Sequence, residues 1–436
     1  MKNKNTLKKT YLVAQQNLDL SVIPTPIDKA TGNDIETQKS IAMQVAQART
    51  QDVTMALNSV KIHGTFKGVT VGGNTAVYEY VLSQDSNLPD NLDRIQKQIS
   101  NILRTSSIPI ITISAGTLKL FINNGVNIPV SFVEMIKKRK KDMLGHISGM
   151  IGVDAMGNPI YFELGDKVPH AILFGRPGIG KTVSLEVIIY SVMSATDPEH
   201  LRIMYIDGKG NSFEYMKANN HPNPFTYAPP CDGSVDIEYA RAAIRHLENE
   251  VRRRIALFKD REVSKLSEYN ELLEKEGKPI LPEILVVIDE FSSIMQKDKY
   301  LKASEAIKNN TVDTVDRLEY IAKMARSTGI RMLLANHSAR KDCISYKISA
   351  NIPGRISLGT AEPIESEFIA PESRISLHLI SQPGEFYSFM NGIEKAEHGN
   401  SPFLDSDVIF ALNDGLVKHF GTCKYLKTRD EILAED

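Results

Sequence analysis

The residues most able to do chemistry stand in one glycine-rich segment, GRPGIGKT, which follows a short apolar run. The segment fits the pattern G-x-x-x-x-G-K-[ST], whose glycines let successive backbone N–H groups converge on a polyphosphate without Cβ clashes. Lys181 would neutralise the β- and γ-phosphates, Thr182 would give its hydroxyl to Mg²⁺, and the positive end of the following helix would favour the anion. The candidate nucleotide-binding residues are Gly175, Arg176, Pro177, Gly178, Ile179, Gly180, Lys181, Thr182 and Val183.

The pattern by itself is a weak signal, because glycine is common enough for chance matches. Its surroundings strengthen it. The apolar run 171–174 predicts a strand, and the segment after the loop predicts an amphipathic helix. The expected buried face of that helix is Leu185, Ile188, Ile189 and Val192. Strand, phosphate loop and helix then follow one another in the order that nucleotide binding requires.

Two adjacent acids, Asp289 and Glu290, end another apolar run, ILVVIDE. An aspartate at the end of a strand can hold the Mg²⁺ shell, and a neighbouring glutamate can polarise the attacking water. The alternative is an ordinary helix N-terminus decorated with acids. Because the pair follows a complete phosphate loop after a suitable number of elements, we interpret it as the second half of one hydrolytic site.

Strands and helices must alternate around this site to position it. Apolar runs recur at 201–207, 284–290, 330–336, 355–359 and 385–390, with helical segments between them. The longest helix, IEYARAAIRHLENEVRRRIALFKD, places on one face Ala240, Ile244, Leu247, Val251, Ile255 and Phe258. Near-continuous apolar runs joined by helices are typical of a parallel sheet that is buried on both faces. Functional groups then belong at the carboxyl ends of the strands.

The first third of the chain has a different character. Residues 1–35 are polar with scattered prolines and predict a flexible arm. Residues 60–133 alternate like strands around a Gly-Gly pair, enclose the helix LDRIQKQISNILRT, and end in a second hairpin, IITISAGTLKLFIN. The stretch before them predicts a helix with a loosely spaced apolar face, Ile35, Ile41, Val45, Ala48, Val53 and Leu57. Together these segments predict a small α/β accessory module whose own residues indicate no chemistry.

Composition limits the class of protein. Of the 436 residues, 42% are hydrophobic, which suffices for a packed core, and the formal net charge of −1 means that a polyanion must be met by local patches. The three cysteines are far apart and indicate reduced thiols in a cytoplasmic protein, without a zinc site or a disulfide framework. No segment is apolar for long enough to cross a membrane, so membrane insertion is not expected. The basic run 137–141 is either a solvated linker or a contact with phosphate or another subunit.

In combination, these motifs resemble the motor of the FtsK/SpoIIIE family of double-stranded DNA translocases. The matching segments stand in the family's order: VPHAILFGRPGIGKT, RIMYIDGKG, RHLENEVRRRIALF, ILVVIDEFSSIM, IAKMARSTGIRMLLAN, ANIPGRISL and QPGEFYSF. The resemblance covers about residues 40–412. It implies an α/β fold, with a RecA-like P-loop ATPase core and a mainly parallel sheet over 146–412. A helical segment and small α/β accessory domain would precede the core over 36–145, and a short polar tail would follow it over 413–436.

The resemblance also implies a ring of subunits, a hexamer, with duplex DNA threaded through its centre and ATP with Mg²⁺ held between neighbours. Asp289 would then hold the metal and Glu290 would activate water. Arg326 matches the arginine that the family offers to the next subunit's nucleotide, where it would stabilise the charge of the transition state. The alternative for Arg326 is a helix-capping cation near Gly329. Arg355 is a second candidate contact to phosphate or to the subunit interface.

Two departures from the family pattern concern sensing and DNA contact. Where the family has Thr-Gln followed by Arg-Pro, this chain has NHSA, in which Asn336 or His337 could still sense the γ-phosphate by hydrogen bonding. Positions that are basic in the family's DNA-facing loops are here Ser349, Pro363 and Glu367. The candidate contacts to the DNA phosphates are the nearby cations Arg340, Lys341 and Lys347.

The chain shows neither membrane helices before the motor segment nor a winged-helix DNA reader after it, which disfavours a sequence-directed chromosome pump. We therefore expect an ATP-driven ring translocase that moves double-stranded DNA without reading its sequence, for plasmid or conjugative transfer or for phage DNA handling. A recruiting protein of the mobile element would be a further partner. Two alternatives stay open: an ATPase of the same fold that moves or remodels protein, and a DNA-binding partner in which nucleotide only switches assembly.

Overall fold

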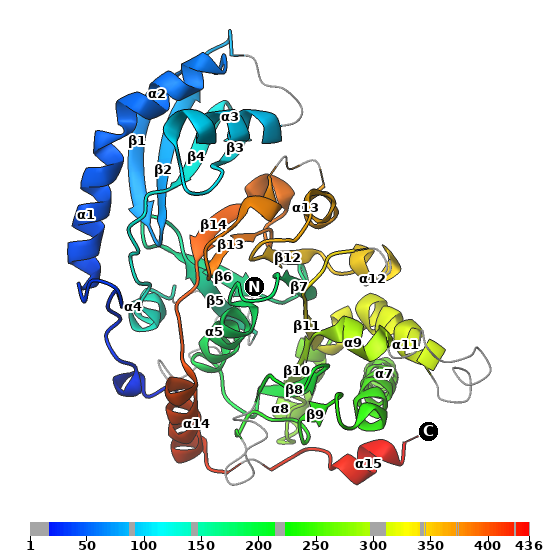
Figure 1. The fold of residues 1–436 in the computed structure, drawn as a ribbon. Coiled ribbons are helices and arrows are strands. Elements are labelled where there is room, and N and C mark those ends of the chain that lie inside the picture. Colours follow the sequence, from blue (N-terminus) through cyan, green and yellow to red (C-terminus); the bar gives the residue numbers. More distant parts are fainter. Residues whose placement is uncertain are drawn as a thin grey trace, which may run out of the picture.

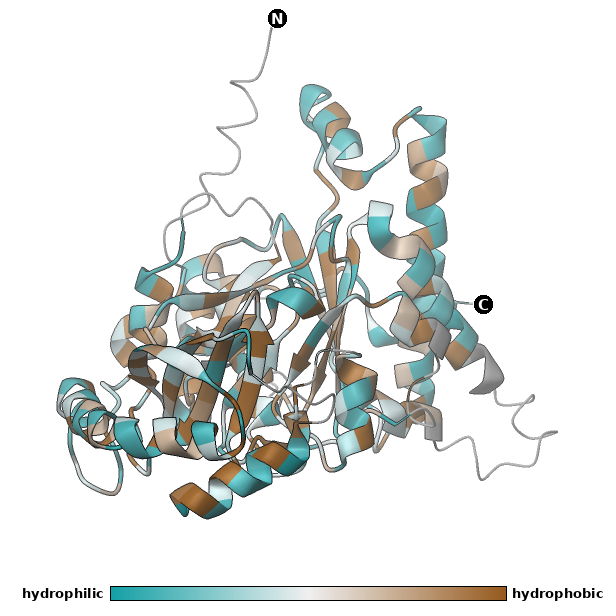
Figure 2. Ribbon diagram, turned by 90° about the horizontal axis from the view of Figure 1, so that it is seen from above, coloured by the Kyte–Doolittle hydropathy of each residue, from teal (hydrophilic) through white to brown (hydrophobic). Residues whose placement is uncertain are grey.

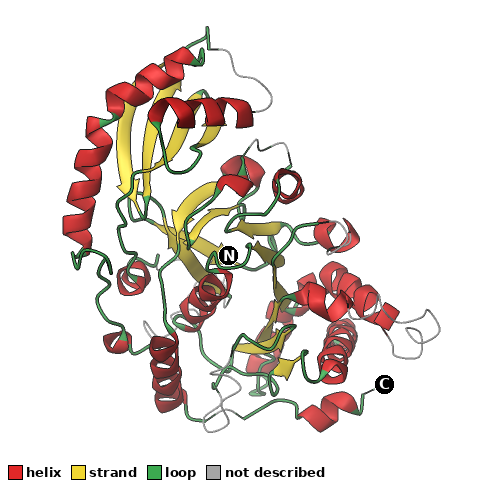
Figure 3. Ribbon diagram, viewed as in Figure 1, coloured by secondary structure: helices red, strands yellow, loops and turns green. Residues whose placement is uncertain are grey.

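Two β-sheets organise the part of the chain that the structure describes (Figure 1; Figure 3). This computed structural model describes residues 17–86, 92–140, 147–213, 223–296, 311–340, 344, 346–371, 373, 375–422 and 424–435. Four strands form a small sheet in the order β1-β2-β4-β3. Ten strands form a large sheet in the order β6-β5-β14-β13-β12-β7-β11-β10-β8-β9. The fold is α/β, as predicted.

The middle of the large sheet is parallel, and the strands from β12 to β9 in that order each run parallel to their neighbours. Their bounds are β7 (His170–Phe174), β8 (Leu201–Asp207), β9 (Cys231–Asp232), β10 (Glu283–Asp289), β11 (Ile330–Asn336) and β12 (Gly354–Ser357). Nearly all of their residues are buried because helices cover both faces, which explains the uninterrupted apolar runs. The register places Asp289 beside Asp207 and Ala335, so the carboxyl ends of three strands meet at one edge.

Helices pack on both faces of this parallel region. One face carries α5 (Lys181–Met193) and α14 (Ser406–Phe420), and the other carries α7 (Ile237–Asp260), α9 (Phe291–Gln296) and α11 (Thr311–Met324). Shorter helices of this part include α8 (Leu266–Lys275), α12 (Tyr346–Ala350) and α13 (Pro363–Ile369). α7 buries the face predicted for it, apart from the half-buried Ile255. Figure 2 shows hydrophobic residues along the central strands, whereas the outer helices carry hydrophobic and polar residues in alternation.

The helix after the phosphate loop, α5, differs from the prediction. It was expected to be amphipathic, but every residue from Ser184 to Met193 is buried. The reason is that α5 is enclosed: the parallel strands lie beneath it, α14 reaches it through the Tyr190 hydroxyl, and β5 (Ser148–Val153) crosses close to its end. A Cβ at Gly149 of β5 would lie 2.8 Å from the Val192 side chain, so this close crossing requires glycine.

The other end of the large sheet is antiparallel. It contains β13 (Glu385–Ser388), β14 (Glu397–Asn400), β5 and β6 (Pro159–Glu163). The expectation that the run 385–390 continues the parallel series is wrong, because β13 runs antiparallel to β12. The chain between these two strands stays at the carboxyl edge of the sheet, passing through α13 and the 3-10 helix η3 (Leu377–Leu379), and therefore re-enters in the opposite direction.

The small sheet forms the accessory module with three helices, and a short helix α4 (Phe132–Lys137) follows it. The bounds are α1 (Ile35–Ala48), α2 (Thr50–Ser59), β1 (Gly64–Gly72), β2 (Thr75–Leu82), α3 (Asp93–Leu103), β3 (Ile110–Ser114) and β4 (Thr117–Asn123). Helices were predicted over 35–59, but part of the predicted face is wrong, since Ile41 is exposed and Ala42 and Ala46 are buried. The small alanines let α1 lie close to the sheet, where the Tyr78 hydroxyl donates to Ala46 O over 2.9 Å.

Both predicted end segments are packed where the structure describes them: residues 17–35 of the expected flexible arm and most of the expected short polar tail lie against the core. Leu18 is buried in the core beneath α5, and the Asn17 amide donates to Met193 O over 3.0 Å. At the other end, Ile432 of α15 (Arg429–Leu433) is buried against α7, and Glu435 pairs with His246. Isolated apolar residues in polar stretches therefore anchor both segments.

The basic run before the large sheet is partly structural. The Arg139 side chain is half-buried and donates to Ser148 O over 2.9 Å, and the Lys138 ammonium donates to Gly157 O over 2.7 Å. Neither the solvated linker nor the phosphate contact predicted for 137–141 describes Arg139, which ties α4 to the sheet.

Candidate active site

The phosphate loop leaves the end of β7 and enters α5 through two glycines in the left-handed region. Gly178 has φ +79° and Gly180 has φ +93°, conformations that side chains with a Cβ rarely adopt. Pro177 and Gly178 are exposed at the tip of the loop, so its backbone is open to a ligand. Ile179 is buried below them, and its carbonyl accepts from Gly384 N over 2.9 Å.

The segment between β12 and β13 braces this loop from the side. Arg176 N donates to Gly359 O over 3.1 Å, and the Arg176 guanidinium donates to Ile380 O over 3.0 Å. Together with the contact from Gly384, these bonds hold both ends of the loop. The antiparallel return of β13 therefore has a consequence for the site, since it keeps residues 359–384 at the edge where a nucleotide would bind.

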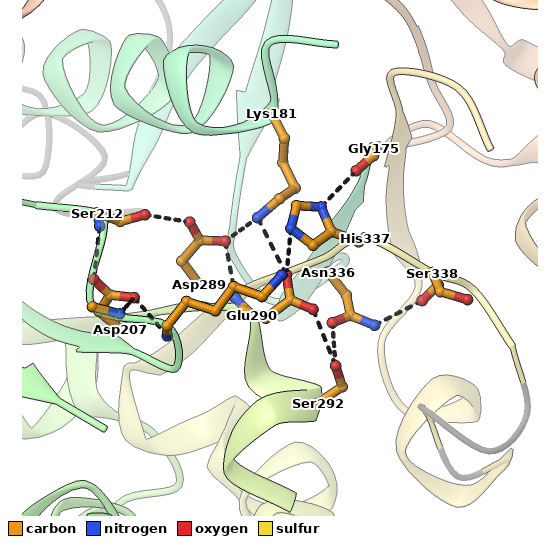
Figure 4. Close-up of polar contacts among 12 residues, drawn as sticks. Gly175, Lys181, Asp207, Ser212, Asp289, Glu290, Ser292, Asn336, His337 and Ser338 are labelled. Atoms are coloured by element: carbon orange, nitrogen blue, oxygen red, sulfur yellow. Dashed lines mark hydrogen bonds and ion pairs between the residues drawn. The ribbon is translucent and has the colours of Figure 1, made fainter. Parts of the chain in front are cut away.

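Lys181 points from the first turn of α5 toward the two acids at the end of β10 (Figure 4). Its side chain is only 5% exposed, forms an ion pair with Asp289, and lies 4.0 Å from Oε2 of Glu290. The loop and the acid pair, predicted as two halves of one site, therefore meet in the structure. A bound polyphosphate would compete with these carboxylates for the lysine.

The end of β8, the strand next to β10, and the segment that follows it support Asp289. The Ser212 hydroxyl donates to Asp289 Oδ2 over 2.6 Å. Ser212 is positioned in turn by Asp207, whose carboxylate accepts backbone N–H groups of Lys209, Gly210 and Ser212 at 2.9, 2.8 and 2.7 Å. Asp207 and Ser212 were not predicted as site residues, although Asp207 ends an apolar run just as Asp289 does.

Glu290 has a strained backbone and a tightly held carboxylate. Its φ is +52°, which is uncommon for a residue with a side chain. Its Oε2 lies 3.0 Å from Nε2 of His337 and 3.2 Å from Nζ of Lys209. Burial alone would raise the pKa of Glu290, but the hydrogen bond and charge of His337, assisted by two lysines, lower it to about 2. The side chain is therefore an ionised carboxylate that contacts His337 on one side and Lys209 on the other.

The end of β11 links this carboxylate to the phosphate loop. His337 Nδ1 lies 3.1 Å from Gly175 O, so the ring bridges the loop and Glu290. Asn336 is fully buried, and its amide is occupied: Oδ1 accepts from the Ser292 hydroxyl over 2.7 Å and Nδ2 donates to Ser338 O over 2.7 Å. Of the two predicted sensing residues, His337 thus faces the reaction site directly, while Asn336 fixes the backbone beside it.

The residues present suit a magnesium ion. Thr182, half-buried at the start of α5, offers a hydroxyl, and Asp289 offers a buried carboxylate, both of them oxygen ligands of the kind Mg²⁺ prefers. Among the described residues there is no group of three or more His, Cys, Asp or Glu side chains that could hold a metal without further ligands. Phosphate oxygens and water would complete the coordination, as is usual for Mg²⁺ at a nucleotide.

A family model described as the FtsK/SpoIIIE family matches residues 133–342, which include the phosphate loop and both acids. The chain carries an FtsK/SpoIIIE domain. The resemblance predicted from the motifs is confirmed, and the domain extends from α4 to the residues just after β11.

Curated relatives of this domain include named DNA translocases. The FtsK of Lactiplantibacillus plantarum is 25% identical over 414 residues, covering 92% of this chain and 48% of the relative. The FtsK of Clostridium tetani is 31% identical over 246 residues, covering 55% of this chain and 30% of the relative. The SftA of Bacillus subtilis is 25% identical over 327 residues, covering 73% and 32%. The chain thus spans about half of the length of these relatives or less.

Solved structures share the fold at low sequence identity. The pCW3 conjugation coupling protein TcpA, in its monomer form with ATPγS, matches with a TM-score of 0.55 and 18% identity, covering 85% of this chain and 99% of TcpA. The cytoplasmic domain of the type VII secretion ATPase EccC of Thermomonospora curvata matches with a TM-score of 0.53 and 18% identity, covering 65% and 32%. These likenesses support the predicted P-loop ATPase fold. None of the helices in the described ranges combines the length and apolar character that a membrane crossing needs.

Arg326 of the FtsK/SpoIIIE domain lies away from the site in its own chain. It is exposed on the 3-10 helix η2 (Ala325–Thr328), which precedes the first residue of β11, whereas Asn336 and the site lie at the last. A seven-residue strand spans about 20 Å. The guanidinium of Arg326 therefore does not reach the phosphate loop of its own chain.

Arg355 does not join the site, contrary to its prediction as a nucleotide contact. Its guanidinium donates to Phe368 O over 2.9 Å and to Ile369 O over 2.7 Å, and burial lowers its pKa. It therefore caps the carboxyl end of α13. The cause is the position of β12, which brings Arg355 beside Ile172 in mid-sheet and away from the carboxyl edge.

The predicted DNA contacts are only partly described. Lys341 lies outside the described residues, and so does the side chain of Lys347 in α12. Arg340 is exposed but pairs with Glu362 over 2.5 Å and lies 3.9 Å from Glu365. These two carboxylates partly neutralise the charge of Arg340.

Proposed function

We propose that this protein is an ATPase that moves double-stranded DNA without reading its sequence, assembled as a homo-oligomeric ring that we take to be a hexamer. The observation that carries the proposal is the convergence of Lys181, Asp289 and Glu290 beneath a complete phosphate loop, inside an FtsK/SpoIIIE domain whose curated relatives are named DNA translocases. We further propose a cytoplasmic location and service to a mobile element, through plasmid or conjugative transfer or phage DNA handling. The fold shared with a conjugation coupling protein supports that role.

The geometry suggests how ATP would be hydrolysed. The triphosphate would draw Lys181 from Asp289 to the β- and γ-phosphates, leaving the carboxylate and the Thr182 hydroxyl for Mg²⁺. That ion would neutralise charge on the phosphate oxygens. Glu290 would leave its contacts with His337 and orient the attacking water as a base.

Arg326 would complete this site from a neighbouring subunit. A guanidinium inserted in trans stabilises the charge on the transferring phosphoryl group and is worth on the order of 10³-fold or more in rate. Rings mixed from Arg326→Ala and Lys181→Ala subunits should then recover part of the activity that each variant lacks alone. Mixed rings that assemble without any recovery would contradict the assignment.

A motor that moves protein is the second candidate. The pairing of Arg340 with Glu362 favours it, since a cation engaged in an ion pair is less available to DNA phosphates. The fold shared with EccC is compatible with it.

Displacement of a triplex-forming strand from linear duplex DNA tests the proposal. The purified protein should displace the third strand with ATP, and Glu290→Gln should bind DNA but displace nothing. Hydrolysis without displacement, on duplexes long enough for a ring to load, would contradict DNA translocation and favour the second candidate.

A further inference from the structure

The turn that carries Arg326 is fixed by two buried arginines from outside it. This turn, η2, connects α11 to β11, and Arg326 itself is exposed to solvent. The end of a helix ordinarily leaves its last carbonyl groups to water or to a local cap. Here the carbonyls are met by side chains that come from α7 and β11.

Arg254 holds the end of the turn. Its side chain lies in α7, is among the largest fully buried side chains, and donates from Nη1 to Thr328 O over 2.8 Å. Its Nε donates to Glu250 Oε1 over 2.7 Å, which balances its charge. The guanidinium thus connects a charged helix to the backbone two residues after Arg326.

Arg331 holds the backbone of Arg326 directly. It is 4% exposed, and its Nη1 donates to Arg326 O over 2.8 Å. Its Nη2 lies 3.3 Å from Oδ1 of Asp166, a largely exposed carboxylate. The contact fixes the peptide from which the Arg326 side chain projects.

The rest of the turn is equally constrained. The Thr328 hydroxyl donates to Ala325 O over 2.9 Å, so the carbonyls of Ala325, Arg326 and Thr328 all accept from side chains. Gly329 follows with φ +74°, and a Cβ there would lie 2.2 Å from the Leu266 side chain. These contacts therefore fix the backbone conformation on both sides of Arg326.

Burying two guanidinium groups is costly, and capping a helix end does not require it, because water or a hydroxyl suffices. A cation that must enter a neighbour's site does need a fixed backbone position, since a displacement of about 1 Å can lower the rate about a hundredfold. We propose that Arg254 and Arg331 are positioning residues, which fix the η2 turn so that Arg326 reaches the terminal phosphate of ATP bound by a second copy of this chain. This inference rests on the role in trans proposed above for Arg326.

The test compares steady-state ATP turnover of full-length variants in the presence of duplex DNA. Arg331→Met and Arg254→Met should lower kcat by about tenfold or more with little change in KM, whereas Arg331→Lys should restore part of the rate. Arg253→Met is the matched control. It lies beside Arg254, pairs with the same Glu250 and is half exposed, but it donates to no carbonyl of the turn. It should leave kcat unchanged.

A double variant separates positioning from stability. In the Arg326→Ala background, adding Arg331→Met should lower kcat no further, because the group being positioned is already absent. Arg331→Met subunits should also complement Lys181→Ala subunits in mixed rings, as Arg326→Ala subunits do. Removal of Arg331 leaves its ion-pair partner Asp166 largely exposed, but it also takes a cation away from Glu283, whose pKa burial raises to about 7. The Tm of Arg331→Met, measured beside kcat, identifies the folded protein to which the comparison applies.

The outcomes are distinguishable. If Arg326→Ala itself retains the wild-type rate, the proposed role of Arg326 fails. If Arg326→Ala is slow while folded Arg331→Met and Arg254→Met keep the wild-type kcat, or if their losses add to that of Arg326→Ala, the positioning inference is overturned. A nitroxide at Arg326→Cys provides a readout without turnover: its spectrum should be immobilised in the wild-type background and mobile in Arg331→Met, and an unchanged spectrum would also contradict the inference.

Discussion

Nε2 of His337 lies 3.0 Å from Oε2 of Glu290, and Nδ1 of the same ring lies 3.1 Å from Gly175 O. One side chain thus joins the end of β11, the candidate base and the first residue of the phosphate loop. The residues after His337 lead toward the predicted DNA contacts, beginning with Arg340. A movement of that segment would shift His337 and change its contact with Glu290. Under the proposed function, DNA binding could alter the hydrolysis rate through this contact.

Replacing Glu290 should separate binding from turnover. Glu290→Gln keeps the shape of the side chain and removes the base, so ATP should still bind while kcat falls by about 10²-fold or more. Lys181→Ala should instead abolish ATP binding, because the cation for the phosphates is gone. Fluorescent-nucleotide titration and steady-state turnover measure the two effects. A Glu290→Gln rate close to wild type would exclude the assigned base.

Replacing His337 should loosen the hold on Glu290. With His337→Ala, the carboxylate loses its 3.0 Å contact with the ring and keeps those with Lys209 at 3.2 Å, with the Ser292 hydroxyl at 3.2 Å and with the more distant Lys181. Turnover without DNA should therefore rise several-fold, and the ratio of DNA-stimulated to basal rate should fall. Lys427→Ala, a half-exposed cation near the chain end that pairs with Glu435, is the control. A lower basal rate with an unchanged ratio would show that His337 supports catalysis instead of restraining it.

Acid should weaken the fold through Glu250. Burial raises the pKa of this carboxyl, but Arg253 and Arg254 outweigh burial and lower it to about 2. A lowered pKa means that the stabilisation is complete above the ordinary value of about 4.5 and is lost as pH falls from there toward 2. Glu250→Gln should cost about 3 kcal/mol at pH 7, because it leaves Arg254 buried without its partner.

Thermal unfolding across pH checks this assignment. The Tm of Glu250→Gln should lie well below that of the wild type at pH 7, and the gap should narrow below pH 4.5. A gap that stays constant down to pH 3 would show that the ionised carboxylate is not the source of the stabilisation.

Replacing Arg355 should affect stability and spare the nucleotide. Arg355→Met leaves two carbonyls at the end of α13 without donors, which costs about 1–3 kcal/mol. Because the guanidinium lies away from the phosphate loop, KM for ATP should not change. A rise of tenfold or more in KM with an unchanged Tm would restore the predicted role as a nucleotide contact.

The DNA contact can be tested through its salt dependence. If Arg340 binds a phosphate, Arg340→Ala should lower the slope of log K against log salt by about 1. Arg429→Ala is a matched control, since Arg429 is similarly exposed and also pairs with a carboxylate over 2.5 Å, in its case Asp236, but lies in α15. An unchanged slope for Arg340→Ala would show that the contact with the DNA phosphates lies elsewhere in the chain.

The phosphate loop and the acid pair could be predicted from the sequence because each is marked by a short local motif. A phosphate loop after a strand and an acid pair at the end of another strand must converge, since carboxyl ends of parallel strands share an edge. The ion pair between Lys181 and Asp289 follows from that rule. Asp207 carried the same signal, an acid ending an apolar run, and was not used.

Features that depend on distant packing were not predictable in this way. The role of Arg355 is decided by α13, whose end lies thirteen residues along the chain, and α5 lost its expected polar face because β5 and α14 enclose it. The direction of β13 depends on the path of the chain along the edge of the sheet, which periodicity does not encode. Arg254 is one of several arginines in a charged helix, and only the fold shows that it is buried against the η2 turn.

The most direct test of the central claim is the steady-state ATPase rate of the purified protein with no polymer, with linear duplex DNA and with single-stranded DNA, at low and moderate salt. A motor that translocates double-stranded DNA should be strongly stimulated by the duplex, weakly by the single strand, and less by either as salt rises. A protein that binds ATP and hydrolyses it at one rate under all of these conditions would contradict the account.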